Sequence, residues 1–221
     1  MRQAGRIPTI GRRHVVAGIG LLGAAGAISG CADALISRPD PPDLYTLTPK
    51  STFPDNLPTI DWQLLVEEPE ASAGLDTNRI AVLEGFTRLQ YFAGVAWTDR
   101  APLMVQTLLI ESFSNSDRIV SVGREGFGLR ADYTLQLELR EFQAEMQASG
   151  PPRTHAALTA RLVKLPERVI IANQSFDATH PATSDSFNDI ILAFDEALGD
   201  VMQDIVVWTL RTGEADAASG G

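Results

Sequence analysis

The strongest constraint on the fold of this chain is a long amphipathic run near its C-terminus. Apolar residues recur there every three or four positions, namely Phe187, Ile190, Ile191, Phe194, Leu198, Val201, Met202, Ile205 and Trp208. Acidic residues occupy the opposite side of the same run, at Asp189, Asp195, Glu196, Asp200 and Asp204. A helix with one broad apolar stripe needs an equally broad apolar surface to cover, and a β-sheet offers one. The pattern predicts a C-terminal helix packed on a sheet.

The residues before this run supply the strands and a second helix. Alternating apolar and polar residues predict strands at 62–66, 79–83, 89–96 and 133–140, and a hairpin at 156–165 and 168–176. Helical spacing after Pro102 predicts a helix over about residues 100–114, capped by Thr98 and Asp99. We therefore expect an α/β fold, with a mixed β-sheet covered by two principal helices in a single domain.

The expected domain spans residues 43–211. A stretch interrupted by Pro49, Pro54 and Pro58 precedes the packed part, which we expect to begin near Ile60. The last ten residues, 212–221, contain little to bury and are predicted to be disordered.

The N-terminal thirty residues have the composition of an export signal. They carry four arginines and no acidic residue before an apolar run of 14 residues from Val15 to Ile28. A helix that spans a membrane needs roughly 20 such residues, so the run is typical of a cleaved signal. Ile28-Ser29-Gly30-Cys31 follows directly and resembles the bacterial lipobox. Residues 1–30 are thus predicted to be a lipoprotein signal peptide, cleaved between Gly30 and Cys31, with Cys31 acylated by diacylglyceryl and palmitate chains.

An acylated Cys31 would fix the chain to a membrane. Two or three acyl chains hold a protein far more firmly than one, at about 0.8 kcal/mol for each buried methylene. Residue 32 is Ala rather than Asp, which favours the periplasmic face of the outer membrane over retention at the inner membrane. The Pro-rich residues 32–42 would serve as a tether of up to about 35 Å. Arg12-Arg13 leaves the general secretory and twin-arginine export routes both open.

The charge of the chain excludes one class of partner. The whole sequence holds 18 basic and 28 acidic residues, and removal of the signal takes away four arginines, leaving 14 against 28 and a formal charge of −14. A protein that binds nucleic acid needs surplus Lys and Arg to neutralise phosphates. We therefore expect no nucleic-acid partner and a membrane contact that depends on the lipid anchor.

The sequence shows little catalytic chemistry. His155 is expected on the wet face of a strand and His180 in a loop beside Asp177, and neither has a metal ligand at helical spacing. A nucleophile elbow of the form G-x-S-x-G is absent from the sequence, and the glycines at 123–128 lack the Lys-Ser/Thr of a P-loop. We predict no enzymatic activity, no catalytic residue, no cofactor and no metal.

The order of short motifs along the chain resembles the ABC-type transport auxiliary lipoproteins, from Asp43 to Arg211. The motifs are the lipobox Cys31, Tyr45-Thr46-Leu47, Leu64 to Pro69, Asp76 to Ile80 leading to Tyr91 and Trp97, Asp132 to Leu135 with Glu141-Phe142, and the final helix ending at Trp208. The resemblance implies a lipoprotein like paraquat-inducible protein C, which serves MCE-type ABC systems for lipid transport between membranes. It implies an α/β layered fold and no catalytic residues.

The predicted function is that of a noncatalytic auxiliary subunit of an MCE/ABC-type intermembrane lipid transport system. Its partner would be the MCE-domain subunit, and a homo-oligomer is possible. Two alternatives stay open: a structural or assembly lipoprotein of another envelope machine, such as a secretin or lipopolysaccharide exporter, and an envelope hydrolase.

Intact-protein mass spectrometry of the mature form tests the lipobox. We expect an N-terminal Cys31 that carries acyl chains, and a full-length precursor when Cys31 is replaced by Ala. An unmodified Cys31 would contradict the prediction. Replacing Arg12 and Arg13 together by Lys tests the export route separately, because twin-arginine export should fail.

Overall fold

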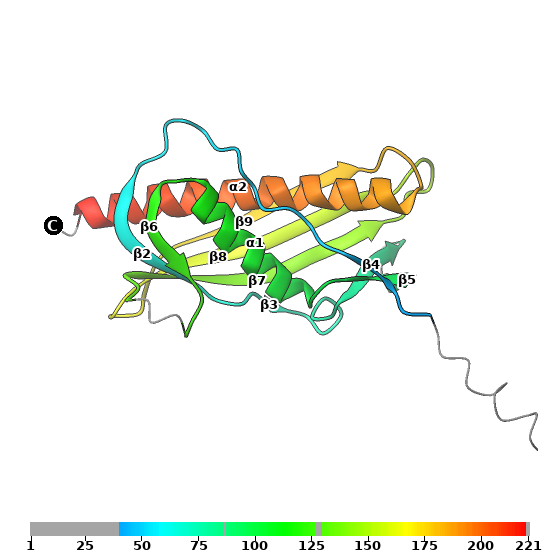
Figure 1. The fold of residues 1–221 in the computed structure, drawn as a ribbon, viewed down its shortest axis with the longest axis horizontal. Coiled ribbons are helices and arrows are strands. Elements are labelled where there is room, and N and C mark those ends of the chain that lie inside the picture. Colours follow the sequence, from blue (N-terminus) through cyan, green and yellow to red (C-terminus); the bar gives the residue numbers. More distant parts are fainter. Residues whose placement is uncertain (1–39, 86, 127–129, 220–221) are drawn as a thin grey trace, which may run out of the picture. The chain divides into compact units, whose positions relative to one another are not determined.

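A long central strand, β7 (Tyr133–Glu145), organises the sheet in the computed structural model, which describes residues 40–85, 87–126 and 130–219. One edge of β7 pairs antiparallel with β8 (Arg153–Lys164) along its whole length, and β8 pairs antiparallel with β9 (Val169–Pro181). The predicted hairpin is therefore confirmed, with longer strands than expected. Figure 1 shows these three strands side by side.

The other edge of β7 is shared by three shorter strands, each parallel to it. They are β2 (Ile60–Val66), β3 (Glu70–Ala71) and β4 (Arg79–Glu84), and they follow one another along β7. The sheet continues from β2 to β6 (Ile119–Gly123), and from β4 through β5 (Arg88–Trp97) to β1 (Asp43–Tyr45). Parallel and antiparallel pairs together make nine strands of one mixed sheet.

Two helices complete the fold and confirm the predicted α/β class. Helix α1 (Ala101–Asn115) packs near β2 and β6, and α2 (Phe187–Ser219) packs on β8 and β9. Both lie on the same face of the sheet (Figure 1). Neither is long and apolar enough to cross a membrane.

The core between α2 and the sheet is centred on three aromatic rings. Trp97, Phe142 and Phe194 are each at most 1% exposed. Their ring centroids lie 5.2 to 5.4 Å apart, in edge-to-face and stacked arrangements. A bulge at Arg140 shifts the alternation of β7, so that Phe142 faces the same core as Leu139. The apolar stripe of α2 is thus buried as predicted.

The start of α1 differs from the prediction. The cap residue is Arg100, and no side-chain hydrogen bond caps the helix, although Pro102 lies in its first turn. The Arg100 guanidinium instead makes ion pairs with Glu68 and Asp76, which join the helix start to the loops beside β3. Thr98 and Asp99 are therefore not the cap.

Residues 46–59 form a strap across both helices, so the packed domain begins well before Ile60. Leu47 and Leu57 are buried in the main core, 4% and 5% exposed. The Lys50 backbone N–H donates to the Ser112 hydroxyl on α1 (2.9 Å), and the Thr48 hydroxyl donates to Asp195 on α2 (2.7 Å). Prolines suit such a strap, because it takes part in no sheet ladder.

The C-terminus corrects a second expectation, because α2 continues to Ser219. The predicted disorder of residues 212–221 is wrong for 212–219. The Tyr133 hydroxyl and the Lys164 ammonium both donate to Asp216, at 2.7 and 2.8 Å. The sequence around Asp216 has little apolar surface of its own, and these partners come from the sheet.

Two glycines of α2 meet different surroundings. A Cβ added at Gly213 would lie 2.3 Å from Cζ2 of Trp62, a residue only 5% exposed, whereas one at Gly199 would meet only Cδ of Lys50 at 3.9 Å. We expect Gly213→Ala to lower the free energy of unfolding by about 1–3 kcal/mol through overpacking.

The matched control is Gly199→Ala. It should leave stability unchanged or raise it by up to about 1 kcal/mol, since Ala is the better helix former. Equal effects of the two substitutions in urea unfolding would contradict the close approach of α2 to Trp62.

Candidate docking face

The face of the sheet opposite the two helices is formed by polar side chains, and we call it the open face. The alternation of β7, β8 and β9 places on it Glu138, His155, Thr159, Arg161, Asn173, Ser175, Asp177 and Thr179. The four residues from β9 are all exposed. The side chains pair across strands, as in the hydrogen bond between Thr159 and Ser175 (2.9 Å) and the ion pair of Arg161 with Glu138 (3.8 Å).

His155 lies in an ion-pair network at one end of the open face. Its Nδ1 is 2.9 Å from Glu145 and its Nε2 is 2.6 Å from Asp177. Arg153 pairs with Glu145 on its other side, at 2.7 Å. The strand register creates this network, because Arg153 lies opposite Glu145 and His155 follows two residues later on the same face.

These contacts favour the charged form of the imidazole. Partial burial lowers the pKa of His155, but the hydrogen bonds with Asp177 and Glu145 raise it by more, so the pKa lies above its ordinary value. Burial likewise raises the pKa of Glu145, and its bonds with Arg153 and His155 outweigh that effect and lower it. The network therefore alternates cations and carboxylates, in the order Arg153, Glu145, His155 and Asp177.

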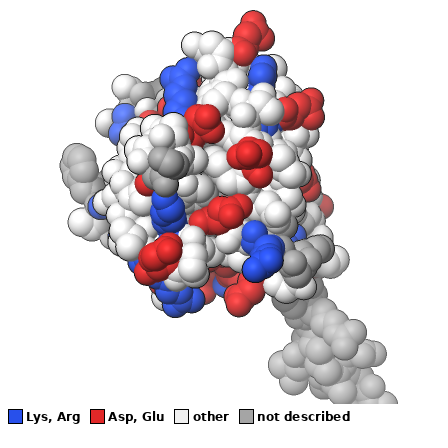
Figure 2. Space-filling view, turned by 90° about the vertical axis from the view of Figure 1, so that its left-hand side faces the viewer, with Lys and Arg blue, Asp and Glu red and all other residues white. Residues whose placement is uncertain are grey.

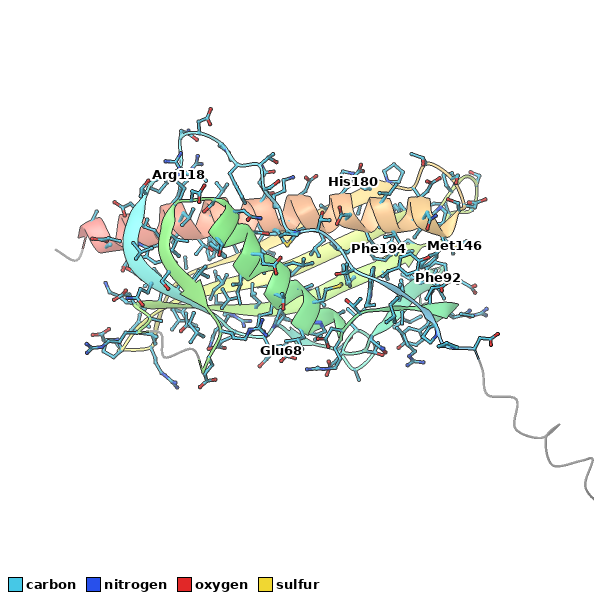
Figure 3. The ribbon with its side chains drawn as sticks, in the orientation of Figure 1. Glu68, Phe92, Arg118, Met146, His180 and Phe194 are labelled. Atoms are coloured by element: carbon cyan, nitrogen blue, oxygen red, sulfur yellow. The ribbon has the colours of Figure 1, made fainter. Side chains whose placement is uncertain are left out.

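His180 was expected in a loop, but it belongs to β9 and faces the helix side. Its Nδ1 is 3.2 Å from Glu196 and its Nε2 is 2.9 Å from Asp200, both on α2. Figure 3 shows His180 beside this helix. Lys50 of the strap also pairs with Asp200, at 3.3 Å. These contacts join the end of β9, the strap and α2.

Carboxylates contact both ring nitrogens of each histidine in the described part of the chain. With both ring nitrogens in contact with carboxylates, neither imidazole has a nitrogen directed at a nucleophile, as a general base would need. Within residues 40–85, 87–126 and 130–219, no group of three His, Cys, Asp or Glu side chains is arranged so that it could hold a metal ion. The predicted cleavage and lipidation residues, Gly30 and Cys31, lie outside the described residues.

Five surface hollows have volumes of about 270 to 430 Å³, and each is lined by charged side chains. One of about 360 Å³ lies on the open face, where Val163 and Ile170 form an apolar floor beside Glu67 and Arg168. Figure 2 shows acidic and basic side chains interspersed on one end of the domain. The arrangement resembles a polar protein-binding surface more than an apolar lipid pocket.

Sequence reasoning could not find the His155 network. Glu145 and Asp177 lie 10 and 22 residues from His155 along the chain, and only the register of three strands brings them together. Alternation correctly placed His155 on a wet strand face. The predicted hairpin was the one sequence signal that could have brought His155 near Asp177. Its exact pairing depends on a bulge and a turn, which the sequence pattern does not fix.

The raised pKa of His155 predicts a pH dependence of stability. A group whose pKa is higher in the folded than in the unfolded state stabilises fully below its unfolded pKa, about 6.5, and loses this contribution as pH rises through the folded pKa. We expect the urea midpoint to fall as pH rises above about 6.5 and through the folded-state pKa of His155, and His155→Gln to flatten this slope.

Substitution His180→Gln is the matched control and should retain the part of the slope that comes from His155. NMR titration of the imidazole protons measures the pKa directly. A His155 pKa at or below its ordinary value would contradict the network.

Comparisons with known proteins agree with this fold. The family model described as "ABC-type transport auxiliary lipoprotein component" matches residues 45–206. The crystal structure of a Xanthomonas campestris protein of family DUF330 is 30% identical, with a TM-score of 0.75 over 79% of this chain and 98% of that one. A crystal structure of an uncharacterised protein, 12% identical, has a TM-score of 0.60 over 76% of this chain and 97% of that one, and shares the fold alone.

A longer relative is also similar in sequence. An uncharacterised protein of Bradyrhizobium diazoefficiens is 29% identical over 157 residues, which cover 69% of this chain and 40% of the relative. The chain therefore matches less than half the length of this curated relative.

Proposed function

Because the chain belongs to the family of ABC-type transport auxiliary lipoprotein components, we propose that it is a noncatalytic subunit of an MCE-type ABC system that moves lipids between the inner and outer membranes. The family model covers the strap, the sheet except for the first two residues of β1, and most of α2. The proposed role is auxiliary: the chain holds another subunit in place while that subunit carries the lipid.

The proposed attachment is the acylated Cys31 at the periplasmic face of the outer membrane. The tether of residues 32–42 would let the domain stand up to about 35 Å from the lipid. The formal charge of the mature chain, −14, opposes close contact with anionic head groups. Acyl chains would therefore hold the domain at the bilayer and leave its polar surfaces free for protein.

One observation carries the docking proposal: both helices cover the same face of the sheet (Figure 1). The residues that the strand register places on the opposite face are mostly polar. Partly exposed charged groups, such as Glu138 and Arg161, lie on this open face at 45% and 38% side-chain exposure. Polar groups that stay hydrated in the free protein and pair across an interface give specificity and a fast association rate. We infer that the open face contacts the MCE-domain subunit, and that the acidic chain selects a basic surface there.

A charge reversal on the open face tests this contact. Substitution Glu138→Arg replaces an acidic group with a basic one, and we expect copurification of the MCE-domain subunit to fall at least tenfold. The matched control is Glu111→Arg, on the exposed side of α1, which should bind as the unmodified protein does. Loss of the subunit by both variants, or by neither, would contradict docking through the open face.

A second experiment tests the role itself. Deleting the gene, or supplying only the Cys31→Ala form, should raise outer-membrane permeability under membrane stress. If permeability stays normal and the MCE-domain subunit never copurifies, the chain is better explained as an assembly lipoprotein of another envelope machine.

A further inference from the structure

An exposed apolar residue, Leu44, lies at the very start of the domain. It belongs to β1, which pairs with the end of β5 at one edge of the sheet. Leu44 is 61% exposed, so its side chain makes little contact with the domain. The described chain begins at Asp40, nine positions after Cys31. Leu44 therefore lies close to the segment that would join the domain to a lipid anchor.

Three partly buried aromatic rings follow Leu44 in space. The ring centroid of Phe187, at the start of α2, lies 5.0 Å from that of Tyr45 and 5.1 Å from that of Phe92. Both pairs are edge-to-face. The three rings pack against the main core, but none of them is enclosed by it as Phe194 is. Part of their apolar surface is therefore left in contact with water.

Met146 adds a further exposed apolar side chain near this cluster. It follows β7 directly, is 46% exposed, and its backbone N–H donates to the Leu83 carbonyl of β4 (3.0 Å). Figure 3 shows Phe92 and Met146 toward the same end of the sheet. The loop that Met146 begins, residues 146–152, has no charged side chain, although the chain as a whole is acidic. We call Leu44, Tyr45, Phe92, Met146 and Phe187 the tether-end surface.

The charges near the tether-end surface are acidic or already paired. Arg88 pairs with Glu84 at the β4–β5 turn (3.3 Å), and Arg153 pairs with Glu145 beside the loop (2.7 Å). Asp43 is exposed next to Leu44. Such charges are repelled by anionic lipid head groups, but zwitterionic lipids carry no net charge to repel them. The surface is therefore compatible with a zwitterionic bilayer and poorly suited to an anionic one.

We propose that the tether-end surface lies against the bilayer that anchors the chain, with the side chains of Leu44 and Met146 among the lipid head groups. The inference rests on the acylated Cys31 of the proposed function. Nine residues span at most about 30 Å, so an anchored domain cannot leave the neighbourhood of the bilayer. The contact is then intramolecular, and a few exposed apolar side chains of low intrinsic affinity are enough to maintain it.

This contact determines which end of the domain points away from the membrane. The loop 146–152 precedes β8 and the turn 165–168 follows it, so they lie at opposite ends of a 12-residue strand, about 40 Å apart. The open-face hollow with its floor of Val163 and Ile170 lies at the end with the turn. With the tether-end surface on lipid, this hollow is directed away from the bilayer, and the open face stays accessible to a protein partner.

A fluorophore on a single thiol tests the orientation. Cys31 is the only cysteine of the chain, so its acylation leaves an introduced cysteine as the one free thiol of the mature protein. Gln147→Cys places the label beside Met146, and the matched control Glu167→Cys places it in the exposed turn at the other end of β8. In phosphatidylcholine vesicles with nitroxide-labelled head groups, we expect the label at 147 of the full lipoprotein to be quenched about threefold more than the label at 167.

A second set of variants tests the apolar contact itself. Replacing Leu44 and Met146 together by Ser removes two exposed side chains, so the fold should persist while quenching at 147 falls to the level at 167. The matched control replaces Val169 and Ile170 by Ser, which are equally exposed at the opposite end, and should leave quenching at 147 unchanged. Addition of phosphatidylglycerol to the vesicles should lower quenching at 147, because the domain is acidic.

The outcomes separate this inference from the proposed function. If the lipoprotein floats with the vesicles but the labels at 147 and 167 are quenched equally, the lipid contact is refuted and the anchor stands. If the protein does not float, the anchor is refuted and this inference with it. Loss of quenching at 147 when the MCE-domain subunit is added would assign the tether-end surface to that protein instead of lipid. The first measurements contain no partner subunit, so they leave docking through the open face to its own tests.

Discussion

Burial of one face of β7 and β8 under α2 is the constraint on which the rest of this domain depends. The three rings of Trp97, Phe142 and Phe194 come from β5, β7 and α2, and none of them is buried by its own element. Apolar side chains of this size contribute roughly 1.5–3 kcal/mol each when they leave water. The helix, the central strand and the β4–β5 arm are therefore stable only as one unit.

Because both helices cover one face of the sheet, the other face is left to water. This difference determines which residue types occupy each face. The open face has small hydroxyl side chains and ion pairs where the helix face has leucines and alanines. Arg153 and His155 balance Glu145 and Asp177 there, so the network adds structure without a strong net field. Neutralised pairs of this kind suit a protein surface that is hydrated when free and pairs with a partner when bound.

The strap and the C-terminal turns of α2 show how the ends of the chain are held. Thr48 and Lys50 bind side chains of both helices, and Asp216 receives hydrogen bonds from β7 and β8. The start and the end of the domain are thereby fixed to the same layer of the fold. The proposed acylation of Cys31 would suit this arrangement, because a pull on the N-terminal side of the domain would pass to the core and not to a loose segment.

Periodicity in the sequence was enough to predict the class of fold, the two helices and most strands. Apolar residues repeat every 3.6 positions on one side of a helix and every two positions on one side of a strand. Both patterns can be recognised within a short window of sequence. The family resemblance was likewise readable from the order of motifs, and the family match confirms it. The lipobox at Cys31 remains a prediction of the sequence.

The tertiary structure decided what depends on distant residues. The register of β7, β8 and β9 places Glu145 and Asp177 on either side of His155. His180, expected in a loop, lies in β9. Asp216, in a segment expected to be disordered, accepts a hydrogen bond from Tyr133 of β7. The tertiary structure also leaves one edge of β9 unpaired among the described residues and Trp208 half-covered. Such contacts join residues that are tens of positions apart, and their pairing is set by bulges, turns and packing that no local pattern encodes.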